Sequence, residues 1–244
     1  MPDKPILIIH PQDNTTKFLN RVKNHLIESF SDQVHHFNVH PNDRSHKDCL
    51  ARIAKHPETG FIIFLGHGRS DKLYGAKGKK YGSLVSFEAT LEYPDEYYYN
   101  DDFINIDNID IFSGKKVFCL SCNSNEKLAH YALDKGAILF LGFGDIPTSR
   151  GEMTDRNGDV SNELIIKIKT ELNYIIKTSL FYGIRMKFTF QELLNLIKFI
   201  TSQRIAEVKI NQKYFKERNT LSDILYCVKK ETIIYGNNKL KMID

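Results

Sequence analysis

Short apolar or alternating runs separated by polar segments are the main pattern along the first 145 residues of the chain. Each run has the length of a buried strand, and most of them stop at glycine, serine or another polar residue. There are five: residues 6–9, 33–39, 61–65, 116–120 and 137–141. Strands that alternate with helices form mostly parallel sheets with helices on both faces, so the pattern predicts a doubly wound α/β fold.

Apolar residues at helical spacing fill the segments between these strands. We expect helices over residues 45–54 and 126–134, and a longer one after the first strand, with Thr15 or Thr16 as its cap. The apolar stripe of that longer helix consists of Phe18, Val22, Leu26 and Phe30. Helices with such a stripe cover a sheet by turning the apolar side inward.

Past the fifth strand the pattern changes. A polar stretch over residues 148–159 predicts a surface loop, and leucine and isoleucine spacing predicts two long helices over residues 164–180 and 189–210. Residues 232–235 are expected to form a sixth strand. That strand would return the chain to the sheet, so we expect one domain over residues 1–244. Its expected parts are a core (1–146), a helical covering segment (147–231) and a closing strand (232–244).

The connection over residues 69–114 is too long for a plain loop, so we expect it to carry structure of its own. A hairpin or a short strand is expected over residues 84–91. Residues 104–109 alternate but are rich in asparagine and aspartate, which favours a turn or the start of a helix.

Composition limits the classes of protein to which the chain can belong. With 244 residues, 41% hydrophobic and 26% charged, it has the balance of a globular protein. No apolar run approaches the roughly 20 residues of a membrane span, and the first residues do not resemble a signal peptide, so we expect a cytoplasmic protein without a membrane partner. The net charge of +4 does not favour a nucleic-acid partner. The four cysteines fit reduced thiols better than a disulfide scaffold: Cys49, Cys119, Cys122 and Cys227.

No motif predicts a cofactor or a metal site. Cys119 and Cys122 have the spacing of a redox or metal pair, but Cys119 falls inside a predicted strand, where packing is the better interpretation. The histidines of the second strand and the following helix lack paired ligand spacing. Gly142 and Gly144 lack the rest of a dinucleotide fingerprint.

Two of the predicted strands end near a reactive residue. His67 follows the run over residues 61–65, and Cys122, 55 residues later, follows the run over residues 116–120. Ligands of parallel sheets gather at the carboxyl ends of the strands, so neighbouring strands would place imidazole and thiol in one crevice. An imidazole favours the thiolate and can protonate an amine leaving group, which is cysteine peptidase chemistry. The N–H groups of Gly68 and Cys122 are the expected oxyanion donors.

These segments resemble the CHAT branch of the caspase-like cysteine peptidases, a clan that also holds caspases, metacaspases, separase, clostripain and gingipains. Residues 234–240 are similar to the closing strand of gingipain-like and CHAT members, with Asn237 and Asn238 where Asp and Pro are usual. The resemblance is otherwise carried by two pairs of segments: residues 61–68 with 73–75, and residues 117–124 with 136–142.

The resemblance implies a caspase-like three-layer α/β/α sandwich with a mostly parallel sheet of about six strands. It implies that His67 is the general acid and base, that Cys122 is the nucleophile, and that Gly68 lies beside the oxyanion site. His10, at the end of the first strand, is expected to line the cleft or to be structural, and His130 is the fallback imidazole.

Substrate choice in this clan depends on residues that follow the first strand and the later strands. Acidic residues there select Arg or Lys at P1, the residue before the scissile bond. The acidic candidates in this chain are Asp13 and Asp145, with Asp71 close behind His67. We therefore expect a basic P1 residue, and Arg150 is the rival anchor for an acidic one.

Two functions remain open at this point. The first is a cysteine endopeptidase that cleaves a protein or peptide substrate through an acyl-enzyme. By resemblance it would be a regulated effector of bacterial antiviral defence or cell death, awaiting an activating protein or small ligand. The second is a catalytically silent module of the same fold that senses a small molecule or a partner protein.

Overall fold

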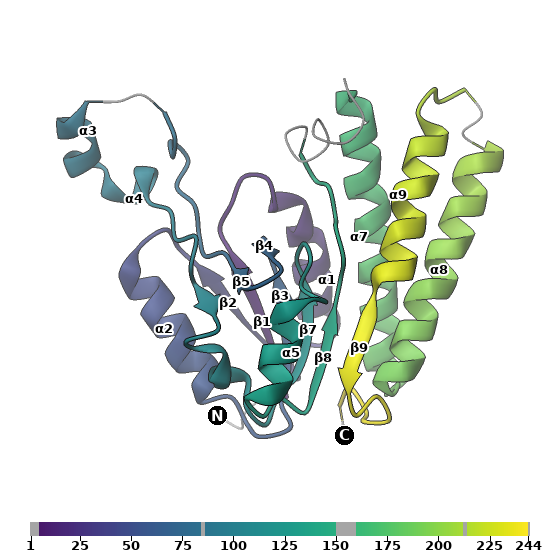
Figure 1. Ribbon diagram of the computed structural model, residues 1–244, viewed down its shortest axis with the longest axis horizontal. Coiled ribbons are helices and arrows are strands. Elements are labelled where there is room, and N and C mark those ends of the chain that lie inside the picture. The colour runs from purple at the N-terminus through teal and green to yellow at the C-terminus, as the bar shows by residue number, and fades with distance from the viewer. Residues whose placement is uncertain (1–4, 84–85, 150–159, 212–213, 244) are drawn as a thin grey trace.

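The protein is built around one six-stranded sheet with helices on both of its faces. The computed structural model describes residues 5–83, 86–149, 160–211 and 214–243. The strand order is β2-β1-β3-β7-β8-β9, and Figure 1 shows α2 and α5 on one side of the sheet and α7, α8 and α9 on the other. The predicted α/β class is confirmed, and the layers are consistent with a three-layer α/β/α sandwich.

The sheet is mostly parallel. Its first five strands in chain order pair parallel with their neighbours, and the last strand pairs antiparallel with β8. The predicted strands, including the closing one, agree with the observed bounds to within two residues at each end. These strands are β1 (Ile6–Pro11), β2 (Val34–Val39), β3 (Phe61–Leu65), β7 (Lys116–Leu120), β8 (Leu139–Gly142) and β9 (Ile233–Gly236).

Burial of both faces explains the apolar sequences of the central strands. Side chains alternate between the faces of a strand, so Ile6 and Ile8 belong to one hydrophobic core and Leu7 and Ile9 to the other. Burying one such side chain stabilises the fold by about 1.5–3 kcal/mol. Since both faces are covered, the polar and reactive groups of this part of the chain lie at the strand ends.

Two groups of helices cover the sheet. One face is covered by η1 (Lys17–Leu19), α1 (Asn20–Ser29), α7 (Asn162–Arg185), α8 (Phe190–Asn211) and α9 (Arg218–Glu231). The other is covered by α2 (Asp43–Ala54), η2 (Ile109–Phe112) and α5 (Lys127–Asp134). Within the described part of the chain, no helix is both long and apolar enough to cross a membrane.

The helical segment after residue 160 differs from the prediction, because three long helices replace the two expected. The additional helix, α9, buries Leu221, Leu225 and Val228 at helical spacing against the core. Most of its other residues are polar, so the sequence signal is weak. Of the loop expected over residues 148–159, only residues 148–149 are among those described.

The long connection after β3 carries its own small sheet, as expected. That sheet has the order β4-β5-β6 and is followed by η2. The hairpin or strand expected over residues 84–91 is wrong: residues 84–85 lie outside the described part, and Phe87–Glu92 forms α3, whose cap Ser86 accepts a hydrogen bond from Ala89 N. The remaining elements are β4 (Gly68–Arg69), β5 (Lys72–Leu73), α4 (Pro94–Tyr97) and β6 (Ile104–Asn105).

Acidification is predicted to destabilise the fold through buried histidines. Burial lowers the pKa of His56 from 6.5 to about 4, and burial also lowers the pKa values of His10 and His46. Between pH 6.5 and about 4 the unfolded state therefore binds protons that the folded state does not. We expect His56 to lower the free energy of unfolding by about 1.4 kcal/mol per pH unit in this window, and His10 and His46 to act in the same direction.

Urea unfolding between about pH 7.5 and about pH 5 measures this effect. His56→Gln should reduce the pH dependence of the unfolding free energy, whereas replacement of the exposed His36 by Gln should leave it unchanged. Equal pH dependence in the parent and in His56→Gln would contradict the account.

Candidate active site

The parallel pairing of β3 with β7 brings the two reactive residues to one edge of the sheet. Leu65 lies opposite Leu120 in the register, and each reactive residue follows two positions later. His67 and Cys122 are both half-buried and both line one pocket. The structure thus brings together the imidazole and the thiol that the sequence analysis selected.

A buried hydroxyl group fixes the loop that carries Cys122 through hydrogen bonds. The Ser124 Oγ is fully buried and accepts a hydrogen bond from Phe143 N at 3.0 Å. The same hydroxyl lies 2.8 Å from Cys119 O, to which it donates. Ser124 therefore ties the loop after β7 to the end of β8.

The backbone of this loop closely approaches the backbone at the end of β8. Asn123 N donates to Gly144 O at 2.9 Å, and Asn123 has a left-handed φ of 53°, which asparagine adopts more readily than most residues. A Cβ atom at Gly142 would stand 2.6 Å from Asn125 N. The loop thus turns sharply directly after Cys122.

The Cys122 thiol differs from the other cysteines of the chain in its surroundings. It is half-buried at the pocket and donates to Ile146 O at 3.2 Å. Burial raises the pKa values of Cys49 and Cys119 to about 12, so these two thiols stay protonated and inert. This supports packing as the role of Cys119. Cys227 is exposed on α9.

Two hydrogen-bonded side chains from the segment after β1, Asp13 and Thr15, hold the His67 imidazole, and we call this pair the relay. Thr15 Oγ1 lies 2.5 Å from His67 Nε2 and donates its proton to Asp13 Oδ1 at 2.6 Å. A hydroxyl has one proton, so Thr15 Oγ1 accepts from His67, and Nε2 carries the hydrogen. This network assigns the tautomer and leaves Nδ1 as the free base of the ring. Asp13 Oδ1 lies 3.9 Å from Nε2.

Thr15 and Thr16 do not act as the helix cap that the sequence suggested. Thr16 occupies the cap position of η1 but makes no side-chain cap hydrogen bond, and the Thr15 hydroxyl serves His67 and Asp13 instead. The signal that could have found this role is the Asp13-Asn14-Thr15 turn, because aspartate commonly accepts a hydrogen bond from the backbone two residues later.

The backbone of Gly68, the expected oxyanion donor, lies beside the loop that carries Cys122. Tyr74 N donates to His67 O at 3.0 Å, so the next pair along the hairpin, Gly68 with Leu73, is the non-hydrogen-bonded one. The Gly68 N–H therefore points away from β5. A Cβ atom at Gly68 would stand 2.8 Å from Ser121 Oγ, so the absence of a side chain allows this backbone to lie beside the loop that carries Cys122.

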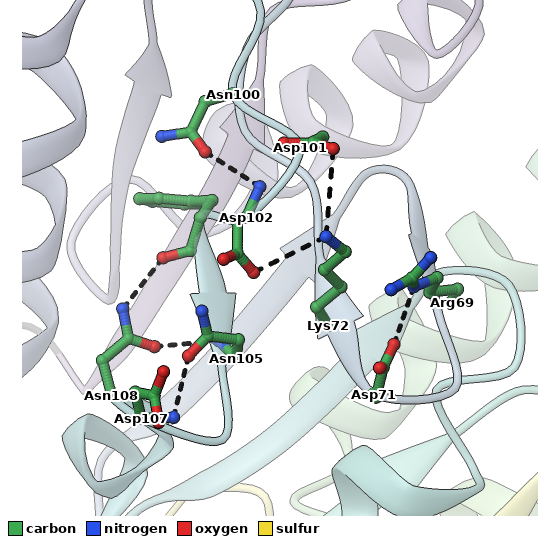
Figure 2. A network of polar contacts seen from close by, with 10 residues as sticks. Arg69, Asp71, Lys72, Asn100, Asp101, Asp102, Asn105, Asp107 and Asn108 are labelled. Carbon is green, nitrogen blue, oxygen red and sulfur yellow. Dashed lines mark hydrogen bonds and ion pairs between the residues drawn. The ribbon is translucent and has the colours of Figure 1, made fainter.

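The three aspartates considered for substrate selection lie in different places. Asp13 supports the imidazole, as described. Asp145, just after β8, donates its N–H to Glu231 Oε2 at 3.3 Å. Figure 2 shows Asp71 paired with Arg69, at 2.8 Å, where the hairpin turns. The hydrogen bond from Arg69 lowers the pKa of Asp71, which keeps this pair charged.

The pocket beside Cys122 is lined mainly by apolar side chains, and none of the three aspartates lies among its lining residues. Leu172 comes from α7 and could not have been assigned to the pocket from the sequence, because its place depends on helix packing. Arg150 lies outside the described residues. The apolar lining consists of Phe18, Leu19, Leu120, Ile146 and Leu172.

His10, expected to line the cleft or to be structural, and His130, the fallback imidazole, serve other contacts. His10 is buried, its Nδ1 donates to Leu65 O at 2.6 Å, and burial lowers its pKa, so the ring is neutral. His130 is exposed on α5 with its ring 4.6 Å from that of Tyr235. Neither histidine lines the pocket that contains Cys122.

Comparison of the chain with models of protein families, with curated proteins and with solved structures finds no match. The caspase-like resemblance therefore stays a prediction that rests on the quoted residues. The chemistry of the site has to be argued from its geometry.

Ser124→Ala is predicted to lower the free energy of unfolding by about 1–3 kcal/mol, because Phe143 N–H would lose its acceptor in a buried place. Urea unfolding measures the change. The matched control is Ser83→Ala at an exposed position, where we expect a change within about 0.5 kcal/mol. Equal stability of the two variants would show that the hydroxyl does not hold the loop.

Proposed function

We propose that the protein is a cysteine peptidase in which His67 and Cys122 form the catalytic dyad. The observation that carries this proposal is the oriented imidazole: Thr15 and Asp13 fix the hydrogen on Nε2 and leave Nδ1 basic, in the pocket that also contains the thiol. Triads of nucleophile, imidazole and orienting group use the same logic.

The proposed reaction begins with transfer of the Cys122 proton to His67 Nδ1. The thiolate attacks the carbonyl carbon of the scissile peptide, and the N–H groups of Gly68 and Cys122 stabilise the resulting oxyanion. The imidazolium then protonates the leaving amine as the C–N bond breaks, which leaves a thioester. A water molecule deprotonated by His67 hydrolyses this acyl-enzyme and restores the thiol.

The thiol must change direction before this reaction can start. Its proton is directed at Ile146 O, so the S–H bond has to turn away from this carbonyl before the proton can pass to His67. Because Ile146 also lines the pocket, a substrate or activator that occupies the pocket can favour this rotation. This supports the regulated behaviour expected from the family resemblance.

The lining of the pocket favours an apolar P1 side chain, such as leucine or methionine. A side chain next to the scissile bond must enter space adjoining Cys122, and that space is bounded by apolar groups from η1, β7 and α7. The pocket has room for about one water molecule, so it has to widen when such a side chain enters. Burying the charge of arginine or aspartate there without a partner would be costly. We therefore propose an apolar P1 residue in place of the basic one that the sequence suggested.

Peptidyl acyloxymethyl ketones with Leu, Met, Arg or Asp at P1 test both proposals, with the rate of Cys122 modification followed by mass spectrometry. We expect the Leu and Met reagents to modify Cys122 about tenfold faster than the others, because apolar burial contributes about 1.5–3 kcal/mol. His67→Ala should slow the reaction about 100-fold. Exposed Cys227 is the internal control, and Cys122→Ala is the matched inactive variant.

The outcomes separate the two proposals. Fastest modification by the Arg or Asp reagent would overturn the apolar pocket and leave the dyad standing. If no reagent modifies Cys122 faster than Cys227, the peptidase proposal fails, and the silent sensing module becomes the better account.

A further inference from the structure

A second pocket lies on the other side of Asp13, at the carboxyl ends of β1 and β2. All of its lining residues have polar or charged side chains, in contrast to the pocket beside Cys122. Apart from Asp13, its residues take no part in the reaction proposed above. They include His10, Gln12, Lys17, Lys23, Asn38 and His40.

Lys23 is the unusual member of this pocket. It lies on α1 with 8% of its surface exposed, and burial lowers its pKa. Its ammonium donates one hydrogen bond, to Asn38 Oδ1 at 2.7 Å. Among the residues that the structure describes, no carboxylate forms an ion pair with this ammonium. Lysine is rarely buried to this extent without a charged partner.

The pocket has an excess of positive charge. Lys17 is a second ammonium in its wall, and the carboxylate of Asp13 already accepts two hydrogen bonds from Thr15. The neutral His10 adds no charge, and His40 Nδ1 lies 3.2 Å from Gln12 Oε1. The lining thus contains two lysines, of which Lys17 is exposed, and one carboxylate, which already has hydrogen-bond partners.

We propose that this pocket binds a phosphate monoester group. Lys23 and Lys17 would supply the positive charge, and the side-chain amides of Gln12 and Asn20 lie in the wall as further hydrogen-bond donors. Lysine binds phosphate as a point charge, and a ligand dianion would provide the missing partner for the buried ammonium. The group can come from a small phosphorylated metabolite or from a phosphorylated side chain.

Binding there would take place next to the proposed dyad. Asp13 belongs to the wall of this pocket and, through Thr15, also orients His67. The pocket is nevertheless distinct from the one that contains Cys122, so the proposal does not depend on peptidase activity. Binding should be the same in Cys122→Ala.

Isothermal titration calorimetry of the full chain with inorganic phosphate tests the proposal. We expect saturable binding to the parent and a Kd about tenfold or more higher in Lys23→Met, since a charged hydrogen bond to the ligand is lost. Methionine keeps the apolar stem and removes a buried charge, so the fold should tolerate it. Lys47→Met, at an exposed position on α2, is the matched control. Lys17→Met provides a second variant and should weaken binding in the same direction.

Adenosine monophosphate and a phosphoserine peptide then distinguish a phosphorylated metabolite from a phosphorylated side chain. If either ligand binds more tightly than inorganic phosphate, that result supports the proposal and identifies the source. Sodium chloride at matched ionic strength controls for general salt effects. Absence of saturable phosphate binding to the parent would overturn the proposal. So would equal Kd values in the parent and in both lysine variants.

Discussion

The parallel pairing of buried strands is the constraint on which the rest of the structure depends. Because β1, β3, β7 and β8 run in the same direction, their carboxyl ends meet at one edge of the sheet. One part of the candidate site follows each strand: the Asp13–Thr15 relay follows β1, His67 with Gly68 follows β3, Cys122 follows β7, and the Ile146 carbonyl follows β8. Apolar side chains on both faces hold these strands, so the loops between them are free to carry polar chemistry.

The relay of Asp13 and Thr15 determines which ring nitrogen of His67 carries the hydrogen. A carboxylate that accepts two hydrogen bonds from Thr15 fixes which way the hydroxyl points, and the hydroxyl then fixes the tautomer of His67. The relay also separates two pockets of opposite chemistry. The apolar one suits the side chain of a substrate, and the polar one, with buried Lys23, suits an anion. A ligand in either pocket would lie close to the same imidazole.

Much of this arrangement could be predicted from the sequence, because it follows from local patterns. The apolar run over residues 61–65 and its counterpart over residues 116–120 each have the length of a strand, and parallel sheets collect reactive groups at strand ends. Contacts between distant segments could not be predicted in this way. Thr15 meets His67 across 52 positions, and Leu172 reaches the pocket only through the packing of α7. The α3 helix was missed because β-branched and aromatic residues favoured a strand, although Ser86 is a good cap.

The central claim is that the relay orients His67 so that its imidazole activates the Cys122 thiol. It is tested most directly by the rate of Cys122 alkylation by iodoacetamide as a function of pH, in the parent and in Thr15→Val. The account predicts that the Cys122 rate in the parent stays high well below the ordinary thiol pKa of about 8.5, and that Thr15→Val moves the profile toward that value. A Cys122 profile that matches that of Cys227 and does not respond to Thr15→Val would contradict it.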